Sequence, residues 1–158
     1  IDKINAIIPN CAISQDMIAG LPTETEQDHQ DTLKLMDYVK YSFGYMYSYS
    51  ERPGTLAGRK MEDDVPEETK ARRLQEIVDL QQAHARYRTE QYIGQTVEVL
   101  VEKVSKKSPN EFSGRNSQSI TVVFPKENYK IGDFVNVLVE RTTGATLIGK
   151  AIGLSEMN

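Results

Sequence analysis

The sequence predicts an α/β segment followed by a small all-β barrel of OB-like character. Two changes near residue 93 support this prediction. Before it, short apolar runs flank segments of helical periodicity, whereas after it apolar residues recur at every second position. The charge also changes, because residues 1–92 hold 11 basic and 16 acidic side chains, whereas residues 93–158 hold 8 and 7. We therefore expect two domains, residues 1–92 and residues 93–158.

The first part is expected to contain a βαβ unit. Residues 11–19 form a short, mostly apolar run that a Gly-Leu-Pro turn ends, as in a buried strand. Thr23 and Glu26 have the spacing of a capping box, which predicts that a helix begins there. The aromatic-rich residues 43–49 predict a second strand, and Pro53 follows it closely. A strand, a helix and a strand within roughly 40 residues predict a parallel pair.

A long helix is expected over residues 66–92, which contain neither glycine nor proline. Asp63 and Asp64 precede Pro66, so acidic groups would lie at the positive end of the helix dipole. Its apolar face would carry residues at helical spacing: Leu74, Ile77, Val78, Gln81 and Ala85. Gly94 ends the pattern, so we expect this helix to connect the two domains.

The second part alternates apolar and polar residues in short segments separated by turn residues. The clearest sets lie at 97–101, 120–124 and 135–139, with a weaker set at 147–151 and a further short strand at 112–115. Five short strands in about 60 residues predict a small antiparallel barrel, in which closure removes exposed strand edges.

Few side chains suggest metal or nucleophile chemistry. Cys11 is the only cysteine and lies among apolar residues, so we expect a buried structural thiol. His29 falls on the apolar face of its helix, where we expect it to pack, whereas His84 lies in a polar stretch where we expect solvent exposure. The sequence therefore predicts no catalytic residue and no metal ligand. It also contains no apolar run of the roughly 20 residues that a membrane-spanning helix needs.

Several short motifs occur in order along the chain. They are Asp16-x-Ile18-x-Gly20-x-Pro22-x-Glu24-Thr25, Tyr49-Ser50-x-Arg52-Pro53-Gly54-Thr55-x-Ala57, Arg72-Arg73-Leu74, Val99-Leu100-Val101-Glu102, Gly114-Arg115-Asn116, Val122-x-Phe124 and Leu147-x-Gly149. In this order they resemble the radical-SAM methylthiotransferases. Residues 1–92 resemble the end of the radical-SAM (β/α) barrel with its connecting helix, and residues 93–158 resemble the TRAM domain. The Gly114-Arg115-Asn116 stretch is most similar to the branch that acts on tRNA.

The resemblance implies an activity for a longer parent enzyme, of which this chain would be the C-terminal portion. Such an enzyme adds a methylthio group to C2 of N6-isopentenyladenosine beside the tRNA anticodon, using S-adenosylmethionine and two [4Fe-4S] clusters. Two clusters need about six cysteine thiolates, and this chain has one cysteine. We therefore expect the chain alone to bind no cluster or other cofactor and to be inactive.

The resemblance also implies cofactor-binding residues at the ends of the two strands. They are Ile18, Gly20, Tyr47, Ser48 and Arg52. Ile18 and Gly20 would contact the adenosyl group, and Arg52 would pair with a carboxylate of S-adenosylmethionine or with a tRNA phosphate. The alternative for each is a structural role in a strand or turn. The family has a glycine where this chain has Thr23, so a need for positive φ there is in doubt.

For the TRAM domain, the resemblance implies contact with the tRNA anticodon stem-loop. The candidate residues are Lys103, Lys106, Lys107, Arg115, Lys126 and Lys130, with Phe112 and Tyr129 as possible stacking partners for bases. The alternative is ordinary loop charge and barrel packing. Neither part has the basic charge of an autonomous DNA-binding domain, and we expect no membrane partner.

The enzyme is expected in the cytoplasm. An open strand pair is expected to let copies of the chain associate through residues 1–92. Two other functions remain open: part of a ribosomal-protein methylthiotransferase, or the RNA-binding module of another TRAM-containing RNA-modifying enzyme, such as a tRNA uracil methyltransferase.

Overall fold

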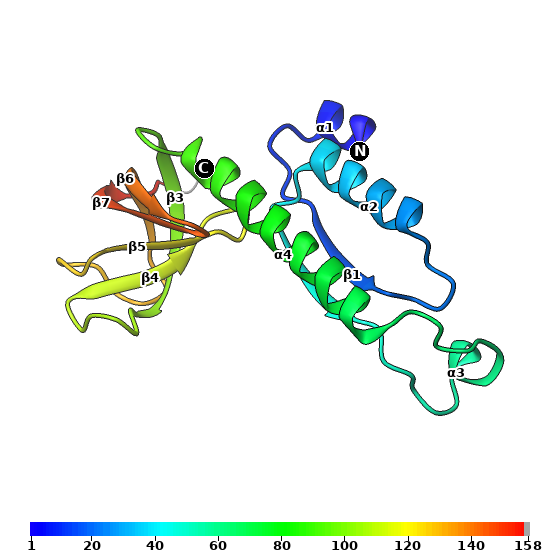
Figure 1. Ribbon diagram of the computed structural model, residues 1–158. Helices are drawn as coiled ribbons and strands as arrows, with labels where there is room; N and C mark the ends of the chain where they lie inside the picture. Colours follow the sequence, from blue (N-terminus) through cyan, green and yellow to red (C-terminus); the bar gives the residue numbers. More distant parts are fainter. Residues whose placement is uncertain (157–158) are drawn as a thin grey trace. The chain divides into compact units, whose positions relative to one another are not determined.

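The computed structural model describes residues 1–156, and residues 157 and 158 of the expected second domain lie outside this range. By contacts, the chain divides into two compact units (Figure 1). One comprises residues 13–84, and the other comprises residues 1–12 together with the chain from Ala85 onward. Helix α4 (Glu67–Glu90) is shared between them along the sequence.

The unit of residues 13–84 contains the expected βαβ arrangement. Strand β1 (Ser14–Ala19) leads into helix α2 (Glu26–Val39), and strand β2 (Phe43–Ser48) follows. The two strands pair in parallel from Ser14 opposite Phe43 to Ala19 opposite Ser48, which confirms the predicted pair. A short helix, α3 (Leu56–Lys60), was not expected, and α4 begins within one residue of its predicted start.

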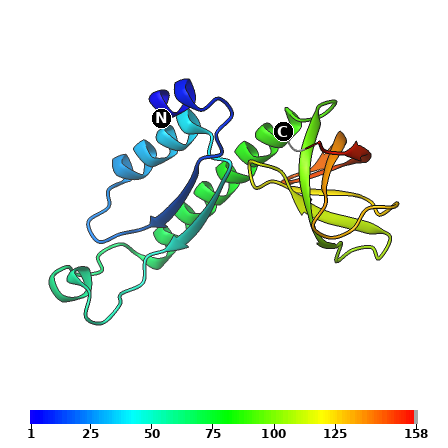
Figure 2. The same ribbon diagram turned by 180° about the vertical axis from the view of Figure 1, so that it is seen from behind.

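Both long helices of this unit cover the same face of the strand pair. Met36 of α2 and Ile77 of α4 are fully buried in one core with Ala19 of β1, and Met17 and Met46 pack against it. Helix α4 lies in front of the strands in Figure 1 and behind them in Figure 2. The opposite face of the pair is consequently open within this unit.

Two local expectations for this unit were wrong. The capping box is formed by Thr25 and Asp28, because the Thr25 hydroxyl accepts from the Asp28 amide and the Asp28 carboxylate accepts from the Thr25 amide. The expected pair, Thr23 and Glu26, instead makes contacts to residues far along the chain. His84 is buried rather than solvated, because the face of α4 that carries it packs toward Asp37 of α2.

The second unit contains a closed barrel of five strands. They are β3 (Thr96–Val104), β4 (Glu111–Arg115), β5 (Thr121–Pro125), β6 (Phe134–Thr143) and β7 (Thr146–Leu154), preceded in the same unit by the short helix α1 (Asp2–Ile7). The order around the barrel is β3-β4-β5-β7-β6, with β6 pairing back to β3. The expectation of a fully antiparallel barrel was wrong, because β5 and β7 pair in parallel.

The alternating pattern places valines inside this barrel. Val99, Val122, Val135 and Val137 are fully buried, and Phe124 fills the space between them. This core explains the period of two, since only every second side chain of a strand faces inward.

Glycine is needed where barrel strands cross most closely. A Cβ atom at position 114 would lie 2.0 Å from the carbonyl oxygen of Leu100, and one at position 149 would lie 2.0 Å from that of Leu138. Real Cβ atoms do not approach backbone oxygens this closely, so these two positions exclude any side chain.

Among residues 1–156, no helix combines the length and the apolar character that crossing a membrane would require.

Candidate functional site

The unit of residues 13–84 carries a pocket at the carboxyl ends of its two strands. Its volume is about 600 Å³, which is in the range of small-molecule sites. The lining residues come from β1, β2 and the segment that follows β2: Asp16, Ile18, Leu21, Tyr45, Tyr47, Ser48, Tyr49, Ser50, Arg52, Thr55 and Ala57. Four of the five predicted cofactor-binding residues are thus brought together, namely Ile18, Tyr47, Ser48 and Arg52.

The strand register explains why the pocket has an aromatic wall. Asp16 lies opposite Tyr45, and Ile18 lies opposite Tyr47, so all four side chains leave the same face of the parallel pair. Ile18 is 49% exposed and Tyr47 is 57% exposed, because both helices cover the other face. Apolar and aromatic side chains of this kind can pack against a flat ring such as a nucleobase.

Arg52 is the only basic residue among those lining the pocket. Its carbonyl oxygen accepts a hydrogen bond of 2.8 Å from the hydroxyl of Thr55, whose Oγ1 also caps α3 by accepting from the Gly58 amide. This turn fixes the backbone of Arg52. Within residues 1–156 the Arg52 guanidinium makes no ion pair, so its fork of donors is available for an anionic group.

Gly20 lies behind the pocket rather than among its lining residues. It is buried with a φ of 76°, and a Cβ there would lie 2.3 Å from Cγ of Lys70. Lys70 is 1% exposed, and its Nζ forms ion pairs of 2.6 Å with Asp63 and Glu67. These two carboxylates raise the pKa of Lys70. Glycine is therefore required here because the turn after β1 packs directly on a buried lysine stem.

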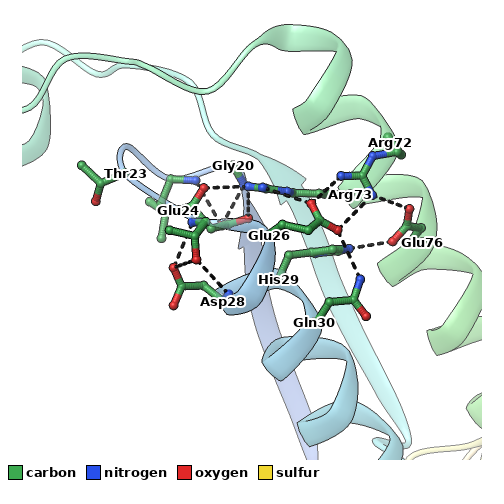
Figure 3. Close-up of polar contacts among 12 residues, drawn as sticks. Gly20, Thr23, Glu24, Glu26, Asp28, His29, Gln30, Arg72, Arg73 and Glu76 are labelled. Atoms are coloured by element: carbon green, nitrogen blue, oxygen red, sulfur yellow. Dashed lines mark hydrogen bonds and ion pairs between the residues drawn. The ribbon is translucent and has the colours of Figure 1, made fainter.

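The turn after β1 is held by Glu24, whose Oε2 accepts from the amides of Gly20 at 2.9 Å and Leu21 at 3.3 Å (Figure 3). Arg73 of α4 donates to the other carboxylate oxygen at 2.9 Å and to the Glu24 carbonyl oxygen at 3.0 Å. In the sequence, Glu24 and Arg73 stand out only as residues of short motifs, and no local signal indicates a role for Lys70. These contacts join residues up to 49 positions apart, which no local pattern reports.

A second group of charges continues this network toward solvent (Figure 3). Arg72 bridges Glu26 at 2.6 Å and Glu76 at 2.7 Å. Hydrogen bonds from Arg72, with smaller contributions from Gln30 and others, lower the pKa of Glu26 to about 2. The buried His29 lies 2.7 Å from Glu76 and lowers the pKa of that carboxyl. His29 therefore packs as expected, and it also has a carboxylate partner.

Five of the six predicted tRNA-binding residues lie toward one end of the barrel. Lys103 lies near the end of β3, Lys106 and Lys107 lie in the loop after it, and Lys126 and Lys130 lie in the loop between β5 and β6. The end of β3 pairs with the start of β4, which pairs with the end of β5, so these loops share one end. The sixth, Arg115, ends β4 and lies 3.8 Å from Glu102.

The two predicted stacking residues are not equally placed. Phe112 is 3% exposed inside the barrel, so for this residue the structure agrees with the alternative, barrel packing. Its ring packs against that of Phe124 within the core. Nζ of Lys126 lies 5.3 Å from the centroid of the Phe112 ring. Tyr129 is half-buried against the same core, with its ring edge-on to Phe124.

Asn116 of the Gly114-Arg115-Asn116 stretch has a structural role. Its side-chain oxygen accepts from the amides of Gln118 and Ile120, which closes the turn between β4 and β5. Burial raises the pKa of Tyr92, and the nearby Asn116 has a smaller, opposing effect on it. The motif therefore stabilises the barrel at two positions, 114 and 116.

The residues present do not form a metal or cluster site. Cys11 is half-buried with a free thiol, and residues 1–156 contain no group of three or more histidine, cysteine or acidic side chains arranged around an ion. One cysteine in the whole chain is too few for an iron–sulfur cluster.

Comparison with known proteins agrees with this geometry. Residues 90–152, which include all five barrel strands except the end of β7, match the model of the TRAM domain family. This part of the chain is therefore similar to a TRAM domain. The OB-like barrel predicted from strand periodicity is thereby confirmed.

The whole chain is also similar to bacterial enzymes named tRNA-2-methylthio-N(6)-dimethylallyladenosine synthase. It is 79% identical over 158 residues to those of Flavobacterium johnsoniae and Flavobacterium psychrophilum, and 66% identical to that of Christiangramia forsetii. The alignments cover 100% of this chain and 33% of each relative. The chain therefore spans about a third of the length of the curated relatives it matches, and the resemblance to the tRNA branch of the methylthiotransferases is confirmed.

Proposed function

We propose that this chain is the C-terminal part of an enzyme that adds a methylthio group to C2 of N6-isopentenyladenosine in tRNA. In this proposal, residues 1–92 form one side of an S-adenosylmethionine pocket and residues 93–158, the TRAM domain, bind the tRNA anticodon stem-loop. The single strongest support is the 79% identity to synthases of that name over the whole chain. The relatives thus favour tRNA over a ribosomal protein as the substrate.

The pocket of about 600 Å³ fits the adenosyl part of S-adenosylmethionine. Ile18 and Tyr47 would contact the adenine ring from adjacent strands, and Ser48 would offer a hydroxyl at the same strand end. Arg52 would pair with the carboxylate of the methionine part. When bound, S-adenosylmethionine supplies the methyl group and the radical that the family's chemistry uses. Gly20 would act indirectly, by letting the turn after β1 pack closely behind the pocket.

Iron–sulfur clusters are not supported by the residues of this chain. With Cys11 alone, the thiolates for two clusters would come from the rest of the enzyme. The proposal therefore gives this chain a role in binding and orienting the cofactor and the RNA, and none in holding the clusters.

The arrangement of the TRAM domain supports tRNA as its partner. Lys106 and Lys107 lie in one loop, after β3, and Lys126 directly follows β5. The backbone amide of Lys126 donates a hydrogen bond to the carbonyl oxygen of Asn110, which precedes β4. Cations on adjacent loops at one barrel end can follow the closely spaced phosphates of a folded RNA.

The open face of the strand pair supports self-association of the isolated chain. Phe43, Tyr45 and Tyr47 are 44%, 61% and 57% exposed on that face, and the parallel pair has unpaired edges. Light scattering on the isolated chain would detect dimers or larger species, and a monomer at all concentrations would contradict this part of the proposal.

The activity can be tested by expressing the complete reading frame in a bacterium whose tRNA carries N6-isopentenyladenosine without the methylthio group. Mass spectrometry of the tRNA nucleosides is expected to show the 2-methylthio derivative. Unmodified nucleoside with a well-expressed, cluster-loaded enzyme would contradict the proposal.

RNA binding can be tested on this chain with a tRNA anticodon stem-loop and a salt titration. Replacing Lys106 and Lys107 by alanine is expected to weaken binding and to reduce the salt slope by about two phosphate contacts. Lys150→Ala is the matched control. Lys150 is a residue of β7 that lies opposite Leu138 of β6, away from those loops. Equal effects of the loop variants and the control would contradict a role for this barrel end.

A further inference from the structure

We propose that Arg73 is a positioning residue for the pocket, acting through Glu24 on the backbone turn that follows β1. This inference rests on the proposed S-adenosylmethionine pocket and adds a residue that lies outside it. Arg73 belongs to α4, and it is separated by about 50 residues from the turn that it holds. Its hydrogen bonds go to Glu24 and Glu26, neither of which lies on the open face of the strands.

The contacts form a continuous network from α4 to the turn after β1 (Figure 3). Arg73 Nη1 holds both a side-chain oxygen and the backbone oxygen of Glu24, at 2.9 and 3.0 Å. The remaining carboxylate oxygen of Glu24 accepts from the amides of Gly20 and Leu21. Leu21 lines the pocket, next to the wall formed by Ile18. Each group in this network is therefore held in place by the group before it, from Arg73 through Glu24 to the turn.

Burial makes this network of contacts rigid. The side chain of Arg73 is 5% exposed and that of Glu24 is 14% exposed, whereas the neighbouring Arg72 is 45% exposed. A buried ion pair with hydrogen bonds to the backbone is little screened by water, and losing one partner leaves the other charge uncompensated. The fork of a guanidinium can hold two oxygens of one residue at once, which the single ammonium of a lysine does less well.

The turn needs this support because its own conformation is unfavourable. Thr23 has a φ of 69°, which a β-branched residue adopts only at a cost, whereas the φ of 76° at Gly20 costs a glycine little. A turn that holds such a threonine would relax if its amides were released. Relaxation would move the backbone of Leu21, and displacements of about 1 Å at a binding site can cost much of its affinity.

The test uses the complete enzyme and S-adenosylhomocysteine, a stable product of the cofactor, with affinity measured by isothermal titration calorimetry. Arg73→Lys is expected to weaken binding on the order of tenfold, and Arg73→Met to weaken it further. Arg72→Met is the matched control, because Arg72 lies next to Arg73 on α4 and pairs with Glu26 and Glu76 at the surface. It is expected to leave the affinity unchanged.

Two further measurements separate positioning from general stability. Hydrogen exchange of the Gly20 and Leu21 amides in this chain is expected to quicken about tenfold in Arg73→Lys and to stay unchanged in Arg72→Met. Ile77→Val weakens the core between α2 and α4 without touching the turn, so it should lower the melting temperature without lowering the affinity.

The outcomes are distinguishable. Failure of the unaltered enzyme to bind S-adenosylhomocysteine would overturn the proposed pocket and this inference together. Binding by the unaltered enzyme and equally tight binding by Arg73→Lys would overturn this inference alone. So would a loss of affinity in Ile77→Val as large as in Arg73→Lys, because the effect would then reflect stability only.

Discussion

The backbone amide of Thr23 donates a hydrogen bond of 2.7 Å to Oδ1 of Asp64, 41 residues later in the chain. Thr23 adopts a φ of 69°, a conformation that β-branched residues rarely take. The doubt about positive φ at this position is therefore resolved, since this chain keeps the turn geometry with threonine. The contact to Asp64 helps to hold it there.

Thr23→Gly is expected to stabilise the chain by about 0.5–1 kcal/mol. The substitution keeps the amide that bonds Asp64 and removes the cost of a left-handed β-branched residue, which exceeds the extra chain entropy of glycine. Thermal unfolding by circular dichroism would measure it. Thr23→Ala is the control, with a smaller gain because it keeps a Cβ. A glycine variant less stable than the original would contradict the strain argument.

Thr25→Ala is expected to destabilise the chain by about 1 kcal/mol, because it removes the side-chain oxygen that accepts from the Asp28 amide at the start of α2. Urea unfolding would provide the free energy of unfolding for this variant and for Thr23→Ala. If Thr23→Ala were the more damaging of the two, the cap would lie where the sequence pattern first placed it.

Gly114→Ala is expected to cost about 2–3 kcal/mol or to prevent barrel closure, because the new methyl group would meet the carbonyl oxygen of Leu100. Gly132→Ala is the control: position 132 has a φ of 98° but no atom within 4 Å of an added Cβ, so only the backbone cost of ~1 kcal/mol applies. Equal losses in the two variants would show that close strand crossing does not determine the choice of glycine at 114.

The stability of the unit of residues 13–84 is expected to fall in acid in part through Glu26. Hydrogen bonds from Arg72 lower the pKa of Glu26 from 4.5 to about 2 in the folded chain. The stabilisation is therefore complete above pH 4.5 and is lost as the pH falls toward 2. Glu26→Gln should lack this part of the acid dependence. Unfolding curves of both proteins from neutral pH to about pH 2 would test this, and parallel curves would contradict it.

The strands and the long helix could be predicted because their signals are local. Val135 and Val137 point inward at every second position, and α4 lacks glycine and proline throughout its length. The capping box could not be placed, because Thr23 with Glu26 and Thr25 with Asp28 fit the same spacing. Contacts to Asp64 and Arg72, 41 and 46 residues away, decide between them.

The residues that line the pocket were predicted better than the buried residues that pack behind it. Ile18 and Tyr47 were expected to share a site because the resemblance to the methylthiotransferases implies cofactor-binding residues at the ends of these two strands. The burial of Lys70 and of His84 depends on how α4 packs against the turn after β1 and against α2. A lysine or a histidine within a polar stretch carries no local sign of such packing.

The parallel contact between β5 and β7 has a consequence for synthesis on the ribosome. Val123 is paired with Ile148, so one side of β5 has no partner until the residues of β7 have emerged. The hairpin of β6 and β7 can form by itself, but the cylinder closes only when its last strand docks. During that interval the nascent chain exposes a valine-rich strand edge, which makes the final step of barrel assembly its most aggregation-prone moment.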